Sequence, residues 1–363
     1  MDLKTFSALA SKLGPHVPLG KSRLQTLCLL IVGVVSARTV NLSHVACERA
    51  GPVRIASTYR RLQRFFQHVR LPQDWAATLI ARLTGHGGPW TLCLDRTNWM
   101  IGQSAVNVLV LALATRRHRI PLLWTQLGRK GNSHTTDRIA LIERFIALFG
   151  KDRIALLLAD REFVGQEWFN WLIQQDIPFV IRVPESLIAE VDGDGERPLW
   201  SVFRRRNAPS RLTLTLLARP NGCGLRLTLE ARRLKAAKRR GRELLIVATN
   251  RPGIKALSAC RKRWAIESLF GDTKTRGLNI EDTRLTNPDK LNLLMAVVAL
   301  AAAWASRTAA LITGNRPFKR KSHGYYAKSW FRTGFDHIRH LLRSHPPDAF
   351  GAWQNINIKA RVE

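Results

Sequence analysis

Acidic residues and paired cysteines are both scarce in this sequence. Asp and Glu number 26 against 58 Lys and Arg. The five cysteines are scattered and form no CxxC pair and no His-containing zinc spacing, which argues against a disulfide scaffold or a zinc finger. We therefore expect reduced, mostly buried thiols and a cytoplasmic protein.

Long hydrophobic segments are also missing. The longest apolar run, Leu293 to Ala305, is too short to span a membrane and ends before Arg307, so we interpret it as a buried core helix. The opening "MDLKTFSALASKLG" lacks a charged segment followed by an apolar one, so we expect no secretory signal. These two features predict no membrane partner.

Positive charge is abundant along nearly the whole chain. The formal net charge is +32 over 363 residues, with dense basic runs at 204–206, 232–242 and 316–321. Such a distribution suits a protein that neutralises the phosphates of a nucleic acid. A ribosomal or anionic-lipid partner would require the same charge, so charge alone does not decide between them.

Residues 1–85 are predicted to form an N-terminal helical DNA-binding domain. We expect helices over residues 23–38, 43–50 and 55–68, with Gly51 and Pro52 separating the last two. The last helix or its edge carries Arg54, Arg60, Arg61 and Arg64. It either enters a DNA groove or forms the solvated face of a helical cap.

From Trp90 onward the pattern changes to strands. Apolar runs predict strands over 90–95, 105–115, 120–128, 153–160 and 178–183, with helices over 137–150 and 165–176. This order is typical of an α/β ribonuclease H-like fold, in which helices flank a mixed sheet. We expect its first part over 86–184, an all-β insertion over 185–252, its second part over 253–312, and a basic C-terminal helical region over 313–363 for DNA contact or dimerisation.

Three carboxylates from distant parts of the chain are expected to meet in this fold. Asp95 and Asp160 end two strands that lie side by side, and Glu267 lies on the helix that follows the insertion. Clustered carboxylates are stabilised by hard divalent cations, so the sequence predicts Mg²⁺, or Mn²⁺ in its place. Two such ions would support in-line phosphoryl transfer.

Three motifs also resemble those of a known family. "LCLDRTNW", "LLLADREF" and "CRKRWAIESLFGDTKTRG" resemble the acidic motifs of DDE transposases of the insertion sequence four family. That family's signature is Tyr, two residues, Arg, three residues, Glu, six residues, Lys. Arg263, Glu267 and Lys274 match it, whereas Cys260 stands at the tyrosine position and cannot provide the phenol's hydrogen bond.

The resemblance implies roles for these residues. Asp95, Asp160 and Glu267 would be catalytic and metal-binding, and Arg263 and Lys274 would contact DNA phosphates. Trp200, in the insertion, is the candidate for stacking on a flipped base during hairpin formation, unless it fills the core of the insertion. Arg161, next to Asp160, is a further candidate phosphate contact, and Glu162 is more simply interpreted as structural.

The sequence therefore predicts the transposase of a bacterial insertion sequence. It would bind terminal inverted repeats as a homodimer, cut them, and join the 3′ ends to target DNA. Three alternatives remain open: a catalytically silent or domesticated DNA-binding copy, a ribonuclease H-like nuclease without strand transfer, and a basic RNA-binding scaffold.

Overall fold

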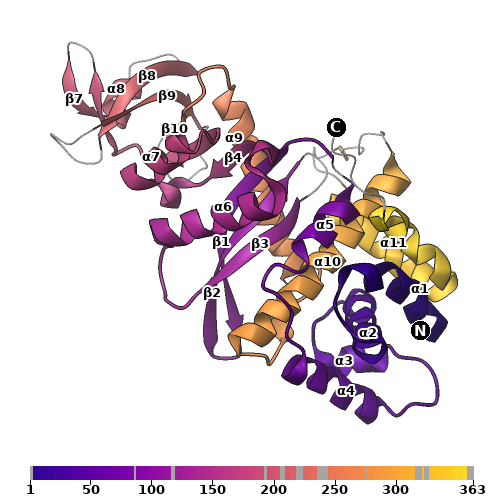
Figure 1. Ribbon diagram of the computed structural model, residues 1–363. Coiled ribbons are helices and arrows are strands. Elements are labelled where there is room, and N and C mark those ends of the chain that lie inside the picture. The colour runs from indigo at the N-terminus through magenta and orange to yellow at the C-terminus, as the bar shows by residue number, and fades with distance from the viewer. Residues whose placement is uncertain are drawn as a thin grey trace.

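The computed structural model of the chain contains a ten-stranded mixed sheet flanked by helices (Figure 1). It describes residues 3–85, 87–115, 119–191, 194–204, 209–217, 224–234, 244–274, 277–314, 321–322 and 327–357. Within these ranges, only the backbone is described for residues 3–5, 119, 264–269, 272–273, 355 and 357. The strand order is β3-β2-β1-β4-β5-β10-β9-β8-β6-β7.

The first half of the sheet has the predicted order of three strands, helix, strand, helix and strand. Antiparallel β1 (Trp90–Ile101), β2 (Ser104–Ala114) and β3 (Arg119–Leu127) are followed by α6 (Thr135–Phe149), β4 (Ile154–Ala159), α7 (Gln166–Gln174) and β5 (Phe179–Val183). β4 pairs in parallel with both β1 and β5. This arrangement confirms the predicted mixed sheet of a ribonuclease H-like fold.

Strand β1 is longer than predicted. We expected it to end at Asp95, but it continues to Ile101 and stays paired with β2 through Ile101↔Ser104. The parallel pairing with β4, in contrast, stops at Leu94↔Ala159. Asp95 thus lies within an antiparallel hairpin, at the position where the neighbouring parallel strand ends.

The segment after β5 extends the same sheet. It contains β6 (Ile188–Val191), β7 (Gly195–Pro198), β8 (Ser210–Leu217), β9 (Gly224–Arg233) and β10 (Leu244–Thr249), and β10 pairs antiparallel with β5. One short helix, α8 (Leu199–Arg204), interrupts these strands. This part projects away from the helical end of the molecule (Figure 1).

Helices build the opposite end of the molecule. The N-terminal segment forms α1 (Leu3–Leu13), α2 (Lys21–Ala37), α3 (Leu42–Cys47), α4 (Ile55–His68) and α5 (Ala77–Thr84), joined by short 3₁₀ turns and loops. Asp282, in the turn before α10, accepts hydrogen bonds from Thr39 Oγ1 at 2.5 Å and Asn41 Nδ2 at 3.3 Å. The N-terminal helices are thus fastened to the remainder of the chain.

Helix α10 (Pro288–Thr313) contains the apolar run that begins at Leu293. The helix is longer than predicted, and by length and composition it would pass as a membrane span, yet 78% of its apolar window is buried inside the protein. It contacts α2, α5 and α11 (Trp330–Ser344) as well as β3. A Cβ at Gly334 of α11 would overlap the carbonyl oxygen of Ala305, so the two helices approach as closely as glycine allows.

Helix α9 (Ala256–Thr273) connects the insertion to this helical end. It contacts β1, β2, β4 and β5 in the first half of the sheet and also β9 and β10. The 3₁₀ segment η5 (Pro346–Asn357) then packs against α1, α5, α10 and α11. Because α9 crosses both halves of the sheet, its faces meet different surroundings.

Candidate active site

Strand pairing places Asp95 beside Asp160. The two residues directly follow Leu94 and Ala159, which form the last parallel pair of β1 and β4. The residues that precede them on the two strands, 92–94 and 157–159, are buried and apolar, because helices cover the sheet here. Two carboxylates are thereby held side by side at the boundary of the core.

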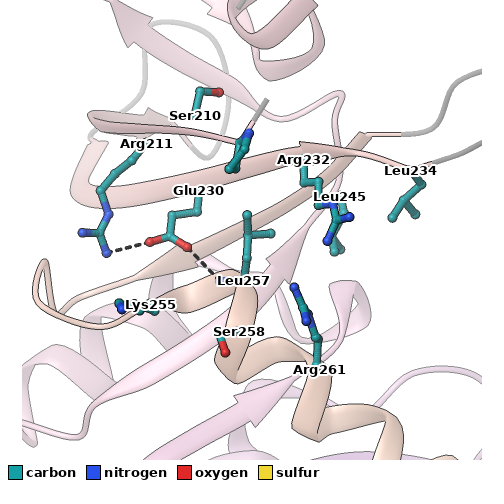
Figure 2. A pocket seen from close by; sticks show the side chains of 11 residues that line it. Ser210, Arg211, Glu230, Arg232, Leu234, Leu245, Lys255, Leu257, Ser258 and Arg261 are labelled. Carbon is teal, nitrogen blue, oxygen red and sulfur yellow. Dashed lines mark hydrogen bonds and ion pairs between the residues drawn. The ribbon is translucent and has the colours of Figure 1, made fainter. Parts of the chain in front are cut away.

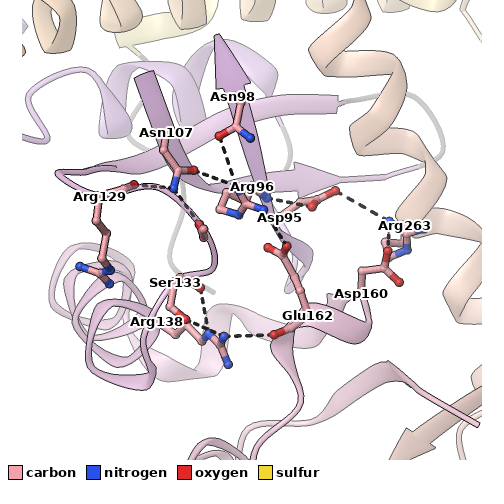
Figure 3. Close-up of polar contacts among 11 residues, drawn as sticks. Asp95, Arg96, Asn98, Asn107, Arg129, Ser133, Arg138, Asp160, Glu162 and Arg263 are labelled. Carbon is pink, nitrogen blue, oxygen red and sulfur yellow. Dashed lines mark hydrogen bonds and ion pairs between the residues drawn. The ribbon is translucent and has the colours of Figure 1, made fainter. Parts of the chain in front are cut away.

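Arg263 of α9 lies between these carboxylates. Its Nη1 atom is 3.7 Å from Asp95 Oδ2 and 3.6 Å from Asp160 Oδ2, and the residue is only 5% exposed (Figure 3). Burial alone would lower the pKa of Arg263, but the carboxylates of Asp160 and Asp95 raise it above its ordinary value. A single guanidinium thus balances part of the negative charge of both carboxylates.

The carboxyl of Asp95 is strongly affected by its surroundings. Burial raises the pKa of Asp95 to about 6, and the charges of Glu162 and Asp160 act in the same direction. The hydrogen bond from the Arg96 backbone N–H to Asp95 Oδ1, at 2.8 Å, and the charge of Arg263 oppose this rise. The negative charge here is therefore only partly compensated, which is the situation in which an added cation stabilises a site.

Asp160 has an oxygen suited to bind such a cation. Its Oδ1 atom is buried and accepts no hydrogen bond from any residue that the structure describes, and Arg182 Nη1 lies 4.0 Å away. Buried carboxylate oxygens of this kind fit Mg²⁺ or Mn²⁺. Among the described side chains no group of three metal-binding residues occurs, and the side chain of Glu267, the third expected ligand, lies outside the described part.

The backbone of residue 267 lies in α9, one turn after Arg263. On a helix, residues four apart share a face, so Glu267 and Arg263 lie on the same side of α9. Arg263 itself approaches Asp95 of β1 and Asp160, which follows β4.

The other predicted residues are distributed around this centre. Lys274 Nζ donates a hydrogen bond at 2.8 Å to the carbonyl oxygen of Asn98 and lies 3.8 Å from Glu281 Oε1, at the C-terminal end of α9. Arg161 is exposed in the turn after β4. Trp200 is 43% exposed on α8, so it does not fill the core of the insertion; Leu199 and Phe203 do.

Cys260, at the signature tyrosine position, is buried in the same region. Burial raises the pKa of its thiol, which the nearby charge of Arg263 counteracts. Cys93 of β1 is fully buried beside it, and burial raises its pKa well above the ordinary value. Both thiols are therefore protonated, apolar neighbours of the charged centre.

A hydrogen-bonded network behind Asp95 was missed by the sequence analysis. Arg96 Nη2 pairs with Glu162 Oε2 at 3.2 Å, and Arg96 Nη1 donates to Asn107 Oδ1 at 3.1 Å (Figure 3). Arg138 of α6 donates to the carbonyl oxygen of Glu162 at 3.1 Å. Glu162 thus contributes to the charge around Asp95 as well as to the structure.

Only weak sequence signals pointed to this network. Arg96 and Glu162 each lie within two residues of a predicted catalytic aspartate, but nothing in the sequence indicates that they pair with one another. Arg182, on β5, is separated from Asp160 by a helix in the sequence and approaches it only through the parallel pairing of β4 with β5.

Comparison with known proteins identifies a family for this chain. The transposase DDE domain family matches residues 86–304, which is more than half of the chain and includes Asp95, Asp160, Arg263 and Glu267. The comparison with curated proteins gives no match. On the extent of the family match, the chain belongs to the transposases with a DDE domain.

Proposed function

We propose that this transposase belongs to the insertion sequence four family and mobilises a bacterial insertion sequence. In this proposal it binds the terminal inverted repeats as a homodimer in the bacterial cytoplasm. It then cuts the element ends and joins their 3′ ends to target DNA. Each joining step exchanges one phosphodiester bond for another, so it requires no high-energy cofactor.

The observation that carries the proposal is the pair of carboxylates, Asp95 and Asp160, that share Arg263. Together with Glu267 they would hold two Mg²⁺ ions, with Mn²⁺ as a substitute. Bound ions of this kind activate a water or a 3′-hydroxyl and stabilise the leaving oxygen.

The protein's own groups would position the DNA. Arg263, already within 4 Å of both carboxylates, would pair with a phosphate next to the scissile bond, and Lys274 would contact another at the end of α9. Arg161 and Trp200 are exposed, and we propose them as a phosphate contact and as the stacking residue of a hairpin intermediate, respectively.

One observation favours a second function, a catalytically silent protein that only occupies transposon ends. Cys260 is buried where the family signature has tyrosine, and its thiol cannot make the hydrogen bond that the phenol would make. Such a protein would keep DNA binding without cleavage. It would resemble the transposase in every binding assay.

The first experiment compares wild type with Glu267→Ala and Asp160→Ala on a labelled duplex that carries the element end and its flank. We expect end cleavage in Mg²⁺, none in EDTA, and a loss of about 10³-fold or more in each variant, corresponding to about 4 kcal/mol of the barrier. Lys262→Ala, an exposed charge change on the same helix, is the control for folding and for charge.

Three outcomes separate the alternatives. Cleavage that survives both acidic substitutions would overturn the assignment. Tight end binding without cleavage by wild type would favour the silent protein, and Cys260→Tyr would then be tested for restored cleavage. Cleavage without joining to target DNA would indicate a nuclease.

A further inference from the structure

A basic groove lies between the insertion and the beginning of α9. It has a volume of about 880 Å³ and is formed by β8, β9 and β10 on one side and by residues 255–261 on the other (Figure 2). Arg232 of β9 and Arg261 of α9 extend toward each other across it (Figure 2). Two elements far apart in the sequence thus contribute to one charged surface.

Among the described residues that line this groove, the one acid, Glu230, already has partners. Glu230 lies directly opposite Arg211 in the β8–β9 register, and Arg211 Nη2 pairs with Glu230 Oε1 at 2.6 Å. The Leu257 N–H, in the first turn of α9, donates to Glu230 Oε2 at 2.8 Å. Glu230 therefore neutralises Arg211 and anchors the helix.

Three further cations remain for an external anion. Arg232, Lys255 and Arg261 are all exposed, and no carboxylate within the described part of the chain forms an ion pair with any of them. The groove thus carries an excess of positive charge. The repulsion among these cations is unfavourable, and a bound anion would relieve it.

The groove is separate from the catalytic carboxylates. Arg261 and Arg263 are two residues apart on α9, so their side chains leave the helix about 200° apart. Arg263 is buried against Asp95 and Asp160, whereas Arg261 faces the insertion. A ligand in the groove would therefore contact α9, the helix that carries Glu267, on the face opposite Arg263.

The lining of the groove indicates the kind of anion. Leu234, Leu245 and Leu257 line it together with the basic residues. Aliphatic side chains beside spaced cations suit a sugar-phosphate backbone, with the deoxyribose on the leucines and the phosphates on Arg232 and Arg261. No aromatic side chain lines the described groove, so it lacks the stacking platform that single-stranded DNA requires.

We propose that this groove binds the backbone of duplex DNA outside the catalytic centre. The inference rests on the proposed function, because it takes DNA as the substrate. It adds a second DNA contact, through Arg232 and Arg261, that lies apart from Asp95 and Asp160. Contacts on both faces of α9 would hold one DNA molecule across the helix that carries Glu267. The groove would thereby fix the path of the duplex relative to the cleavage position.

Salt-dependent DNA binding by matched variants tests the proposal. Arg232→Ala/Arg261→Ala is compared with Arg226→Ala/Lys262→Ala, which removes the same charge from the same two elements at exposed positions outside the groove. Binding to a labelled duplex is measured in EDTA over a range of salt concentrations. Circular dichroism and thermal unfolding confirm that each variant is folded.

The groove variant should show a lower salt slope. Each lost phosphate contact reduces the slope of log K against log salt by about 0.9, so we expect a decrease of about 2 and a loss of roughly tenfold or more in affinity near physiological salt. The control variant should lose less than about threefold, in line with a general charge effect alone.

The outcomes also distinguish this proposal from the catalytic one. Equal losses in the two double variants, or a loss confined to a single strand of the same sequence, would overturn the groove proposal even if wild type cleaves DNA. A selective loss on duplex DNA would support it even if cleavage fails. Absence of DNA binding by wild type would overturn both.

Discussion

The two faces of helix α9 carry the same kind of residue in opposite environments. Arg263 is buried and lies within 4 Å of two carboxylates, whereas Arg261, two positions earlier, is exposed and faces another arginine. The first arginine balances an excess of negative charge inside the protein. The second contributes to an excess of positive charge at its surface.

This difference shows how one helix can serve a strongly basic transposase in two ways. Asp95 and Asp160, two of the few acidic residues, lie together in a largely buried position, where added positive charge is favourable. In the groove, Glu230 pairs with Arg211 and with the Leu257 N–H. Arg232, Lys255 and Arg261 therefore remain available to an anion. Three predictions test this contrast, in decreasing order of expected effect.

Replacing Arg263 should have the largest effect on stability. Arg263→Ala leaves Asp95 and Asp160 facing each other without their shared cation, and removing one partner of a buried ionic cluster costs about 3 kcal/mol or more. We expect this loss in the unfolding free energy measured by urea in EDTA. Addition of Mg²⁺ should recover more stability in the variant than in wild type.

The matched control for this prediction is Arg261→Ala, from the exposed face of α9. Surface substitutions of this kind usually change the unfolding free energy by less than about 0.5 kcal/mol. Similar losses in Arg261→Ala and Arg263→Ala would contradict the contrast between the two faces.

The pH dependence of stability should report on Asp95. Burial raises its pKa to about 6, above the value of 3.8 for an unperturbed carboxyl, so the folded state binds the proton more tightly than the unfolded chain. The stabilisation from protonation is complete below the unfolded value and is lost as the pH rises through about 6. Metal-free wild type should therefore gain stability on acidification from pH 7.5 to pH 5.

Asp95→Asn isolates this contribution, because the amide does not titrate. Relative to the variant, wild type should gain roughly 1–2 kcal/mol of unfolding free energy between these pH values, measured by denaturant in EDTA. Parallel pH profiles for the two proteins would show that Asp95 does not have a raised pKa.

The smallest expected effect concerns the acid of the groove. Glu230→Gln removes one negative charge but keeps an oxygen that can accept the hydrogen bond from the Leu257 N–H. It also leaves Arg211 without its ionic partner, so the groove becomes more basic. We expect duplex binding to strengthen a few-fold, by less than about 1 kcal/mol, in a salt-dependent manner.

Fluorescence anisotropy with labelled duplex in EDTA measures this gain. Glu190→Gln, on β6, removes an exposed carboxylate from the insertion outside the groove and serves as the comparison. If both substitutions strengthen binding equally, the effect of Glu230 is one of overall charge and the groove has no special role.

Much of the half of the sheet that carries Asp95 and Asp160 could be predicted from the sequence, because its strands are continuous apolar runs. Buried parallel strands require such runs, and Asp95 and Asp160 stand out as the first charges after them. The length of β1 could not be predicted, because its continuation depends on pairing with β2. Whether Trp200 is buried depended on how α8 lies against the strands, which local sequence does not specify.

The sequence by itself determined the positive charge, the order of strands and helices, and the spacing that puts Arg263 and Glu267 on one side of a helix. Only the tertiary structure decided that Arg263 lies beside both aspartates, that Glu162 pairs with Arg96, and that Arg232 and Arg261 line opposite sides of one groove. Periodicity and charge are local properties that can be counted along a chain. Which side chains become neighbours depends on strand register and on the rotation of α9 against the sheet, and both are set by packing between distant segments.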